Sequence, residues 1–284
     1  MGRIISGLSE IADRYDCFIL DVFGVIHNGI DLFEGTAGCL QELKAAGKAV
    51  CLLSNSPRRA HIVGAQILGK GLPDEGLFQH VMTSGEATYQ ALQGMDIGQR
   101  CWFIGADIGQ EVLDGHAFEQ VRGPEEADFV LNSLIGQSGE DKAGIVEALR
   151  VAVDRGLPMI CANPDLVVNI GAEQYECAGT FAALYEEMGG VVTYHGKPYA
   201  PVYEACYEFL GRPDKSRICA VGDAFHTDVA GANGFGIDVV WNIEGIHEEE
   251  VTCDLKGEIS DELIEGMLND KAEKPSYVMK GFGW

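Results

Sequence analysis

The sequence has no apolar run of about 20 residues, the length that a membrane-spanning helix needs. The segment Met1–Tyr15 also lacks the apolar centre of a secretory signal. Positive charge is scarce, because 20 lysine and arginine residues stand against 44 acidic ones and leave a net charge of −24. Nucleic acid and anionic lipid both require a basic face. We therefore expect a cytoplasmic protein that binds neither nucleic acid nor membranes, with a homodimer left open as its assembly.

The nine cysteines include no C-x-x-C pair, and no zinc-type spacing of cysteine and histidine is present. An odd and irregular set of cysteines is typical of reduced thiols that pack as small apolar residues. A chain this acidic can handle an anionic substrate only by concentrating positive potential locally. A metal ion, a helix N-terminus or one well-placed lysine could provide it.

Short apolar runs alternate with helix-length amphipathic stretches near both ends of the chain. The early runs are Cys17–Leu20 and Lys48–Leu53, with a helical pattern over Thr36–Ala46 and a second helix expected from Pro57 behind Ser56 as its cap. The late ones are Val191–Tyr194, Ile218–Val221 and Val239–Trp241, with helices over Pro201–Leu210 and near Thr227–Asn233. This alternation predicts a parallel sheet wrapped by helices.

The middle of the chain alternates in the same way, with runs at Trp102–Ile104, Phe129–Leu131 and Met159–Ala162 and a helix near Lys142–Asp154. The polar residues that are candidates for catalysis or ligand binding lie mainly outside this middle segment. We therefore predict an α/β fold: a three-layer, Rossmann-like parallel-sheet core from residues 1–90 and 190–284, with an α/β cap domain, residues 91–189, inserted into it.

The first two motifs follow the two early strands. Asp21 comes directly after an apolar strand, and Gly24 lets the backbone turn close to a bound group. Ser54 and Asn55 fall between the next strand and a helix N-terminus, where exposed N–H groups and the helix dipole favour a phosphate. Open α/β folds place ligands at this carboxyl edge. Taken alone, Asp21 could be a turn residue and Ser56 only a helix cap.

The last two motifs follow the late strands. Lys197, in His195-Gly196-Lys197-Pro198, could balance phosphate charge or keep a nearby carboxylate ionised. Asp223 and Asp228 flank a turn after a buried strand, and carboxylates of this kind suit Mg²⁺. Taken alone, the lysine could be a solvated surface residue and the two acids could be caps.

Together and in this order, the four motifs resemble the haloacid dehalogenase superfamily, specifically its class IIA phosphatases (NagD-type and pyridoxal-phosphatase-like). The resemblance covers nearly the whole chain, with the inserted cap recognisable by Asn163-Pro164-Asp165 and by Ala178–Phe181. It implies a phosphatase that hydrolyses a small phosphorylated metabolite, such as a sugar phosphate, through an aspartyl-phosphate intermediate and with Mg²⁺ as cofactor.

The resemblance also implies a role for each motif residue. The catalytic residues are Asp21, as the nucleophile, and Lys197. Phosphate binding falls to Ser54, Asn55 and Lys197. The metal ligands are Asp21, Asp223, Asp228 and the backbone carbonyl of Phe23. In the cap, we assign substrate recognition to Asn163, Asp165, Gln174 and Tyr175, the last two within the segment Leu166–Tyr175.

Phe23 departs from the family pattern, in which a second aspartate protonates the leaving group and then activates water. General acid–base catalysis contributes about 10² to 10⁴ in rate, so its loss matters. The substrate could have a good leaving group, His27 could substitute, or the protein could be a weak enzyme that chiefly binds its ligand. An Asp-x-Phe-Gly sequence also resembles the first motif of 2-haloacid dehalogenases, which usually lack the Asp223/Asp228 arrangement.

Overall fold

In the computed structural model, the first of two sheets has seven strands in the order β1-β16-β13-β12-β2-β3-β4. Their bounds are β1 (Arg3–Ile5), β16 (Tyr277–Met279), β13 (Asp238–Asn242), β12 (Ile218–Gly222), β2 (Cys17–Asp21), β3 (Ala49–Ser54) and β4 (His80–Thr83). The pairs β2·β3, β2·β12, β12·β13, β13·β16 and β1·β16 are all parallel. The residues described are 2–105, 107–135, 142–170, 173–245, 252–253, 258–259 and 261–284.

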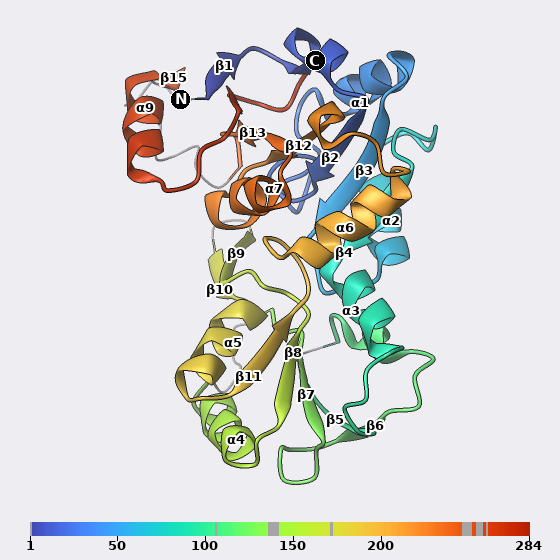
Figure 1. The fold of residues 1–284 in the computed structure, drawn as a ribbon, viewed down its shortest axis with the longest axis vertical. Helices are drawn as coiled ribbons and strands as arrows, with labels where there is room; N and C mark the ends of the chain where they lie inside the picture. The colour runs from blue at the N-terminus through green and yellow to red at the C-terminus, as the bar shows by residue number, and fades with distance from the viewer. Residues whose placement is uncertain are drawn as a thin grey trace. The chain divides into compact units, whose positions relative to one another are not determined.

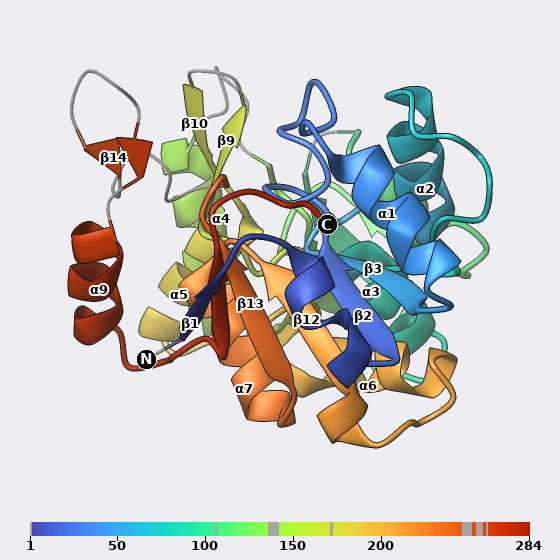
Figure 2. The ribbon, with the colours of Figure 1, turned by 90° about the horizontal axis from the view of Figure 1, so that it is seen from above.

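Helices cover both faces of this sheet. They are α1 (Thr36–Ala45), α2 (Ala60–Gly69), α6 (Ala200–Phe209) and α7 (Ala230–Phe235), and a further helix, α9 (Asp261–Asp270), precedes β16 in the chain. The chain runs outward from β2 to β4 in one direction and from β12 to β13 in the other. Because such crossovers are right-handed, the two directions place their helices on opposite faces. Figure 2 shows α1 and α2 on one face and α6 and α7 on the other, which confirms the three-layer prediction.

The second sheet is also parallel and has the order β11-β8-β7-β5-β6. Its strands are β5 (Arg100–Ile104), β6 (Glu119–Val121), β7 (Phe129–Asn132), β8 (Pro158–Cys161) and β11 (Val191–Tyr194), and the helices around it are α3 (Ser84–Leu92), α4 (Lys142–Asp154) and α5 (Ala178–Glu187). A two-stranded antiparallel hairpin joins β9 (Val167–Ile170) to β10 (Glu173–Glu176). A smaller antiparallel pair, β14 (Thr252–Cys253) and β15 (Glu258–Ile259), comes late in the chain (Figure 1).

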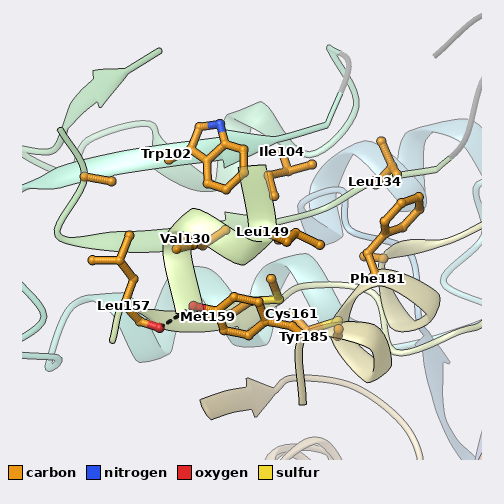
Figure 3. Close-up of a cluster of buried hydrophobic side chains, with 14 residues drawn as sticks. Trp102, Ile104, Val130, Leu134, Leu149, Leu157, Met159, Cys161, Phe181 and Tyr185 are labelled. Atoms are coloured by element: carbon orange, nitrogen blue, oxygen red, sulfur yellow. Dashed lines mark hydrogen bonds between the residues drawn. The ribbon is translucent and has the colours of Figure 1, made fainter. Parts of the chain in front are cut away.

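Alternate residues along the strands of the second sheet belong to two different hydrophobic clusters. Trp102, Val130 and Met159 lie in one cluster with Leu149 of α4 and Phe181 of α5 (Figure 3). The intervening residues Cys101, Phe129, Leu131 and Ile160 belong to a second cluster, together with Leu92 of α3. Successive side chains of a strand point to opposite faces, so a strand covered on both faces is apolar throughout. In the first cluster the Tyr185 hydroxyl donates to the Leu157 carbonyl at 2.7 Å.

The chain divides into two compact units, Met1–Ser54 with Gly64–Met82 and Tyr203–Trp284, and Asn55–Val63 with Thr83–Val202. The second unit contains the whole range 91–189 predicted for the cap and extends beyond it on both sides. The predicted domain boundaries themselves stay a prediction. Eight described cysteines are buried and unpaired, as expected for packed thiols. Over the ranges given above, no helix is long and apolar enough to cross a membrane.

The helix expected from Pro57 begins instead at Ala60. Two hydrogen bonds to α3 and the end of β4 hold residues 56–58 outside the helix: Gly85 N–H donates to the Ser56 carbonyl, and the Thr83 hydroxyl donates to the Arg58 carbonyl. Glu86 then accepts from Ala60 N–H at 3.2 Å and caps the helix. The prediction was wrong by three residues because this side chain comes from α3, outside the local sequence.

Candidate active site

Three aspartates converge at the carboxyl edge of the first sheet. Asp21 ends β2, and Asp223 and Asp228 follow β12, the strand that pairs with β2. One carboxylate oxygen of each lies within 4.8 Å of the other two, and the residues are only 6%, 3% and 4% exposed. Strand connections run in opposite directions from β2 and β12, so the cluster lies at a topological switch point, where such sheets bind ligands.

Glycines make room for this cluster. A Cβ on Gly24, whose φ is +90°, would lie 2.0 Å from Asp223 Oδ2, and one on Gly245 would lie 2.1 Å from the same atom. A Cβ on Gly222 would lie 2.2 Å from Asp228 Cβ. Any other residue at these positions would displace a carboxylate, so the spacing of the acids depends on the glycines as much as on the strands.

Backbone and side-chain hydrogen bonds fix the loops that carry the acids. The indole N–H of Trp241 donates to the Asp223 carbonyl at 3.0 Å, and the Asn242 amide donates to the Gly24 carbonyl at 3.0 Å. Asp228 Oδ2 accepts from Ala224 N–H at 3.2 Å. The sequence patterns alone indicated no role for Trp241, Asn242 or Gly245. Asn242 could have been found, since it is a polar residue at the end of an apolar strand, like Asp21.

The residues fit a divalent cation. Three buried carboxylates this close repel one another when ionised, and a bound cation removes that cost. Oxygen ligands of this kind are those of Mg²⁺, which usually takes one or two protein carboxylates and keeps several waters. The structure thus brings together the three predicted carboxylate ligands, Asp21, Asp223 and Asp228. The identity of the metal and the Phe23 carbonyl as a ligand stay predictions.

The loop after Asp21 holds Phe23 half-buried beside His27. The two rings meet edge to face with centroids 5.8 Å apart. His27 Nδ1 accepts from Gly29 N–H at 2.9 Å. Burial, with a smaller effect of Lys70, lowers the pKa of His27 to about 4. At neutral pH the ring is therefore uncharged, with its Nδ1 lone pair already used, which speaks against His27 as the replacement acid.

Ser54 is the last residue of β3, one position beyond Leu53, which pairs with Asp21. Because β2 and β3 are parallel neighbours, Ser54 and Asp21 lie at the same edge of the first sheet. Ser54 is 6% exposed. Its placement fits the predicted phosphate-binding role, which stays a prediction.

A second cluster forms within the other unit, around Asn55. Its Nδ2 donates to Asp165 Oδ1 at 2.7 Å and to the Lys197 carbonyl at 3.1 Å. Its Oδ1 accepts from Lys197 N–H at 2.7 Å and from the Ser84 hydroxyl at 3.3 Å. Gly196 allows this contact, since its φ is +135° and a Cβ there would lie 2.2 Å from Ser84 Oγ. Asn55, Asp165 and Lys197, predicted from three separate motifs, are thus brought together.

These four bonds use all the hydrogen-bonding groups of the Asn55 amide. The side chain therefore positions Lys197 and Asp165, and a phosphate contact by Asn55 would have to come from its backbone. Asn163 lies beside this cluster, where its Oδ1 accepts from Asp165 N–H at 3.2 Å.

Gln174 and Tyr175 both lie on β10 of the hairpin. Gln174 pairs with Asn169 and Tyr175 with Val168. Consecutive residues of a strand point to opposite faces, so these two side chains do not face the same way. The prediction that both recognise the substrate stays a prediction, and the two side chains could not meet it from the same face of the hairpin.

The fold and the three clustered aspartates define an α/β protein with a carboxylate site suited to a divalent cation, at the switch point of its first sheet. The family model of haloacid dehalogenase-like hydrolases matches residues 18–119, and a HAD-hydrolase-like model matches residues 194–281. A hydrolase of the haloacid dehalogenase-like family from Brucella suis is 33% identical, with a TM-score of 0.83 over 98% of this chain and 100% of its own. The chain belongs to the haloacid dehalogenase-like hydrolases.

Two more distant relatives are named phosphatases. The acid sugar phosphatase of Staphylococcus aureus is 23% identical over 80% of this chain and 86% of its own length. The p-nitrophenyl phosphatase of Archaeoglobus fulgidus is 22% identical, with a TM-score of 0.74 over 94% of this chain and 96% of its own. The family match and the sugar phosphatase bear out the resemblance to the class IIA phosphatases and the prediction of a phosphatase of this type, and the p-nitrophenyl phosphatase shares the fold.

Proposed function

We propose that the protein is a Mg²⁺-dependent phosphohydrolase that acts on a small phosphorylated metabolite, a sugar phosphate or a similar phosphomonoester, with Asp21 as its nucleophile. The observation that carries the proposal is the buried cluster of Asp21, Asp223 and Asp228 at the switch point. The names of the relatives, a sugar phosphatase and a p-nitrophenyl phosphatase, support a phosphate monoester as the substrate class.

In the proposed reaction, a carboxylate oxygen of Asp21 attacks phosphorus. A new bond joins that oxygen to phosphorus, while the bond from phosphorus to the leaving oxygen breaks and its electron pair departs with the leaving group. Water then attacks the aspartyl phosphate, releases inorganic phosphate and restores the Asp21 carboxylate. The proton lost by this water passes to the phosphate or to solvent.

The other residues bind and position. Asp21, Asp223, Asp228 and the Phe23 carbonyl would hold Mg²⁺, which supplies positive charge for the oxygens of the transferring group. Ser54 and Lys197 would bind the phosphate, with Lys197 held by Asn55. Asn163 and Asp165 would contribute to substrate recognition, together with one of the two hairpin residues Gln174 and Tyr175.

Two alternative functions, a 2-haloacid dehalogenase and a ligand-binding protein, can be distinguished from a phosphohydrolase. A 2-haloacid dehalogenase would use Asp21 to displace halide and has no need of a metal, so a buried cluster of three carboxylates disfavours it. A protein that chiefly binds its ligand is suggested by Phe23, which cannot act as an acid or a base. Such a protein would bind Mg²⁺ and a phosphorylated ligand with little turnover.

A phosphoester panel assayed with and without Mg²⁺ separates these functions. We expect turnover that needs Mg²⁺ and is abolished by Asp21→Asn, which keeps the shape of the side chain but removes the nucleophile. Asp96→Asn, a change at an exposed position, is the matched control and should leave turnover intact. Wild-type turnover no faster than that of Asp21→Asn would favour the binding function, and metal-independent halide release from 2-haloacids would favour the dehalogenase.

The proposal also assigns the protein to the cytoplasm, which eight buried and unpaired cysteines among the described residues support. A homodimer remains its candidate assembly. Light scattering of the purified protein measures this directly.

A further inference from the structure

The turn that follows Asp21 closes on itself. Ile26 N–H and His27 N–H both donate to the Val22 carbonyl, at 3.0 and 3.1 Å, and Gly24 N–H donates to the His27 carbonyl at 2.9 Å. The backbone of residue 23 is therefore fixed two positions beyond the proposed nucleophile, where the resemblance to the phosphatases implies the acid that protonates the leaving group. The residue at this position is phenylalanine, which has no proton to give.

The same turn also holds the side chain of His27 in place. A Cβ on Gly29 would lie 3.0 Å from Phe23 Cε2, so Phe23 packs between this glycine and the ring of His27. Gly29 N–H in turn donates to His27 Nδ1. The imidazole is thus engaged by the backbone on one edge and by the phenyl ring on another. The Nδ1 edge of His27 is thus engaged, and Phe23 itself has no acidic group.

Leaving groups differ in how much they need such a proton. An alcohol leaves as a strongly basic alkoxide unless it is protonated in the transition state, and an acid helps only where that charge is otherwise unrelieved. A phenol or a carboxylic acid ionises far more readily, with a pKa of about 10 or about 4. Enol, aryl and acyl phosphates can therefore be cleaved by a nucleophile that works without a partner acid.

We propose that the enzyme prefers phosphorylated metabolites whose leaving oxygen is stable as an anion, namely acyl, enol or aryl phosphates, over phosphates of simple alcohols. This inference rests on the proposed phosphohydrolase function and narrows its substrate class. Among sugar phosphates, it favours an anomeric phosphate over the phosphate of a primary hydroxyl, because the anomeric hydroxyl is the more acidic of the two.

A series of substituted phenyl phosphates tests the inference, since the compounds share a shape and differ in the acidity of the phenol. For the wild type, kcat/KM should fall steeply as the phenol becomes less acidic, and an alkyl phosphate should be turned over at least about 100-fold more slowly than p-nitrophenyl phosphate. Acetyl phosphate should be a good substrate. A shallow dependence would overturn the inference, because it would show that an acid reaches the leaving group from elsewhere.

Two variants show whether residue 23 sets this dependence. Phe23→Asp should flatten the series and raise turnover of the alkyl phosphate by about 10²-fold, with little change for p-nitrophenyl phosphate. Phe23→Leu, which alters packing but adds no acid, should keep the steep dependence. A flattened series in Phe23→Leu would contradict the inference, and the wild-type series remains decisive if Phe23→Asp fails to fold. Absence of all phosphoester turnover would instead refute the proposed function.

Discussion

The side-chain amide of Asn55 binds both backbone groups of a single residue, Lys197, donating to its carbonyl at 3.1 Å and accepting from its N–H at 2.7 Å. Lys197 is only 3% exposed, so these backbone groups have little access to water. A residue next to Ser54 in the sequence thus fixes the backbone of the predicted catalytic lysine.

Asn55→Ala should therefore impair catalysis as well as stability. Leaving buried polar groups unpaired costs about 1–3 kcal/mol, and a displacement of about 1 Å at a catalytic group can cost about 10² in rate. We expect kcat to fall about 100-fold, more than KM changes. Asn233→Ala is the control, because that amide also makes two hydrogen bonds, to Glu273 and Lys274, on the exposed surface. Equal kinetics for both variants would contradict a positioning role.

Gly24→Ala should disrupt the carboxylate cluster. The φ of +90° is unfavourable for alanine, and the new Cβ would lie 2.0 Å from Asp223 Oδ2. Gly47→Ala is the matched control, since its φ of +69° is also positive but no atom lies within 4 Å of its added Cβ. Both variants should lose about 1 kcal/mol through backbone strain. Only Gly24→Ala should also lose the rise in unfolding temperature on adding Mg²⁺.

The effect of Asp223→Asn on the unfolding temperature should change sign when Mg²⁺ is added. Without a cation, removing one of three clustered charges relieves repulsion, so the variant should unfold at a higher temperature than wild type. One kcal/mol corresponds to about 2–4 °C for a protein of this size. With saturating Mg²⁺ the order should reverse, because ligand binding stabilises only the form that holds it. Calorimetric scans with EDTA and with Mg²⁺ measure both, and an unchanged order would argue against a metal site.

The ion pair of Arg59 with Glu86 predicts a pH-dependent contribution to stability. The side chains are 16% and 14% exposed, and bonds from Arg59 and Ala60 N–H lower the pKa of Glu86 despite its burial. The folded pKa lies below the ordinary 4.5, so the contribution is present above about pH 4.5 and is lost as the pH falls through the folded value.

Glu86→Gln should accordingly lower the free energy of unfolding by about 1 kcal/mol at pH 7 and by less below pH 4.5. Glu208→Gln, in an exposed pair with Arg212, should change it by at most a few tenths of a kcal/mol. Urea titrations between pH 3 and 7 provide the measurement. A constant difference over this range would mean that packing of Glu86, and not its charge, matters.

The hairpin offers a test of substrate recognition. Since Gln174 and Tyr175 point to opposite faces of β10, only one of Gln174→Ala and Tyr175→Ala should change the ranking of kcat/KM over a panel of phosphorylated metabolites. The double variant should rank them like the effective single variant. Independent changes from both substitutions would show that neither face of the hairpin is excluded from the substrate.

The three carboxylates of Asp21, Asp223 and Asp228 could be predicted because the sequence signal for them is local. Each acid follows an apolar strand, and parallel strands bring their carboxyl ends to one edge whatever the intervening chain does. The support for these acids could not be predicted in the same way. Gly245 and Trp241 act on Asp223 through space, and a glycine or tryptophan in the sequence does not indicate which atom it approaches.

Asn55 shows the same limit for a residue that was identified. Its position between a strand and a helix suggested a phosphate contact, but four hydrogen bonds to three residues in distant segments use its whole side chain. Saturation of an amide depends on tertiary geometry, which composition and spacing do not encode. The pairing of β1 with β16 is likewise non-local and joins residues near opposite ends of the sequence.

The pairing of Cys17 with Ile218 has a consequence for synthesis on the ribosome. Every strand of the second sheet lies between Arg100 and Tyr194, so that sheet has all its strands once this stretch has emerged. Strands β2, β3 and β4 are made earlier but must wait for β12, because a parallel neighbour from the late part of the chain completes their sheet. During that interval the backbone N–H and C=O groups along one edge of β2 are unpaired, and this edge is a site for chaperone binding or for misassociation of nascent chains.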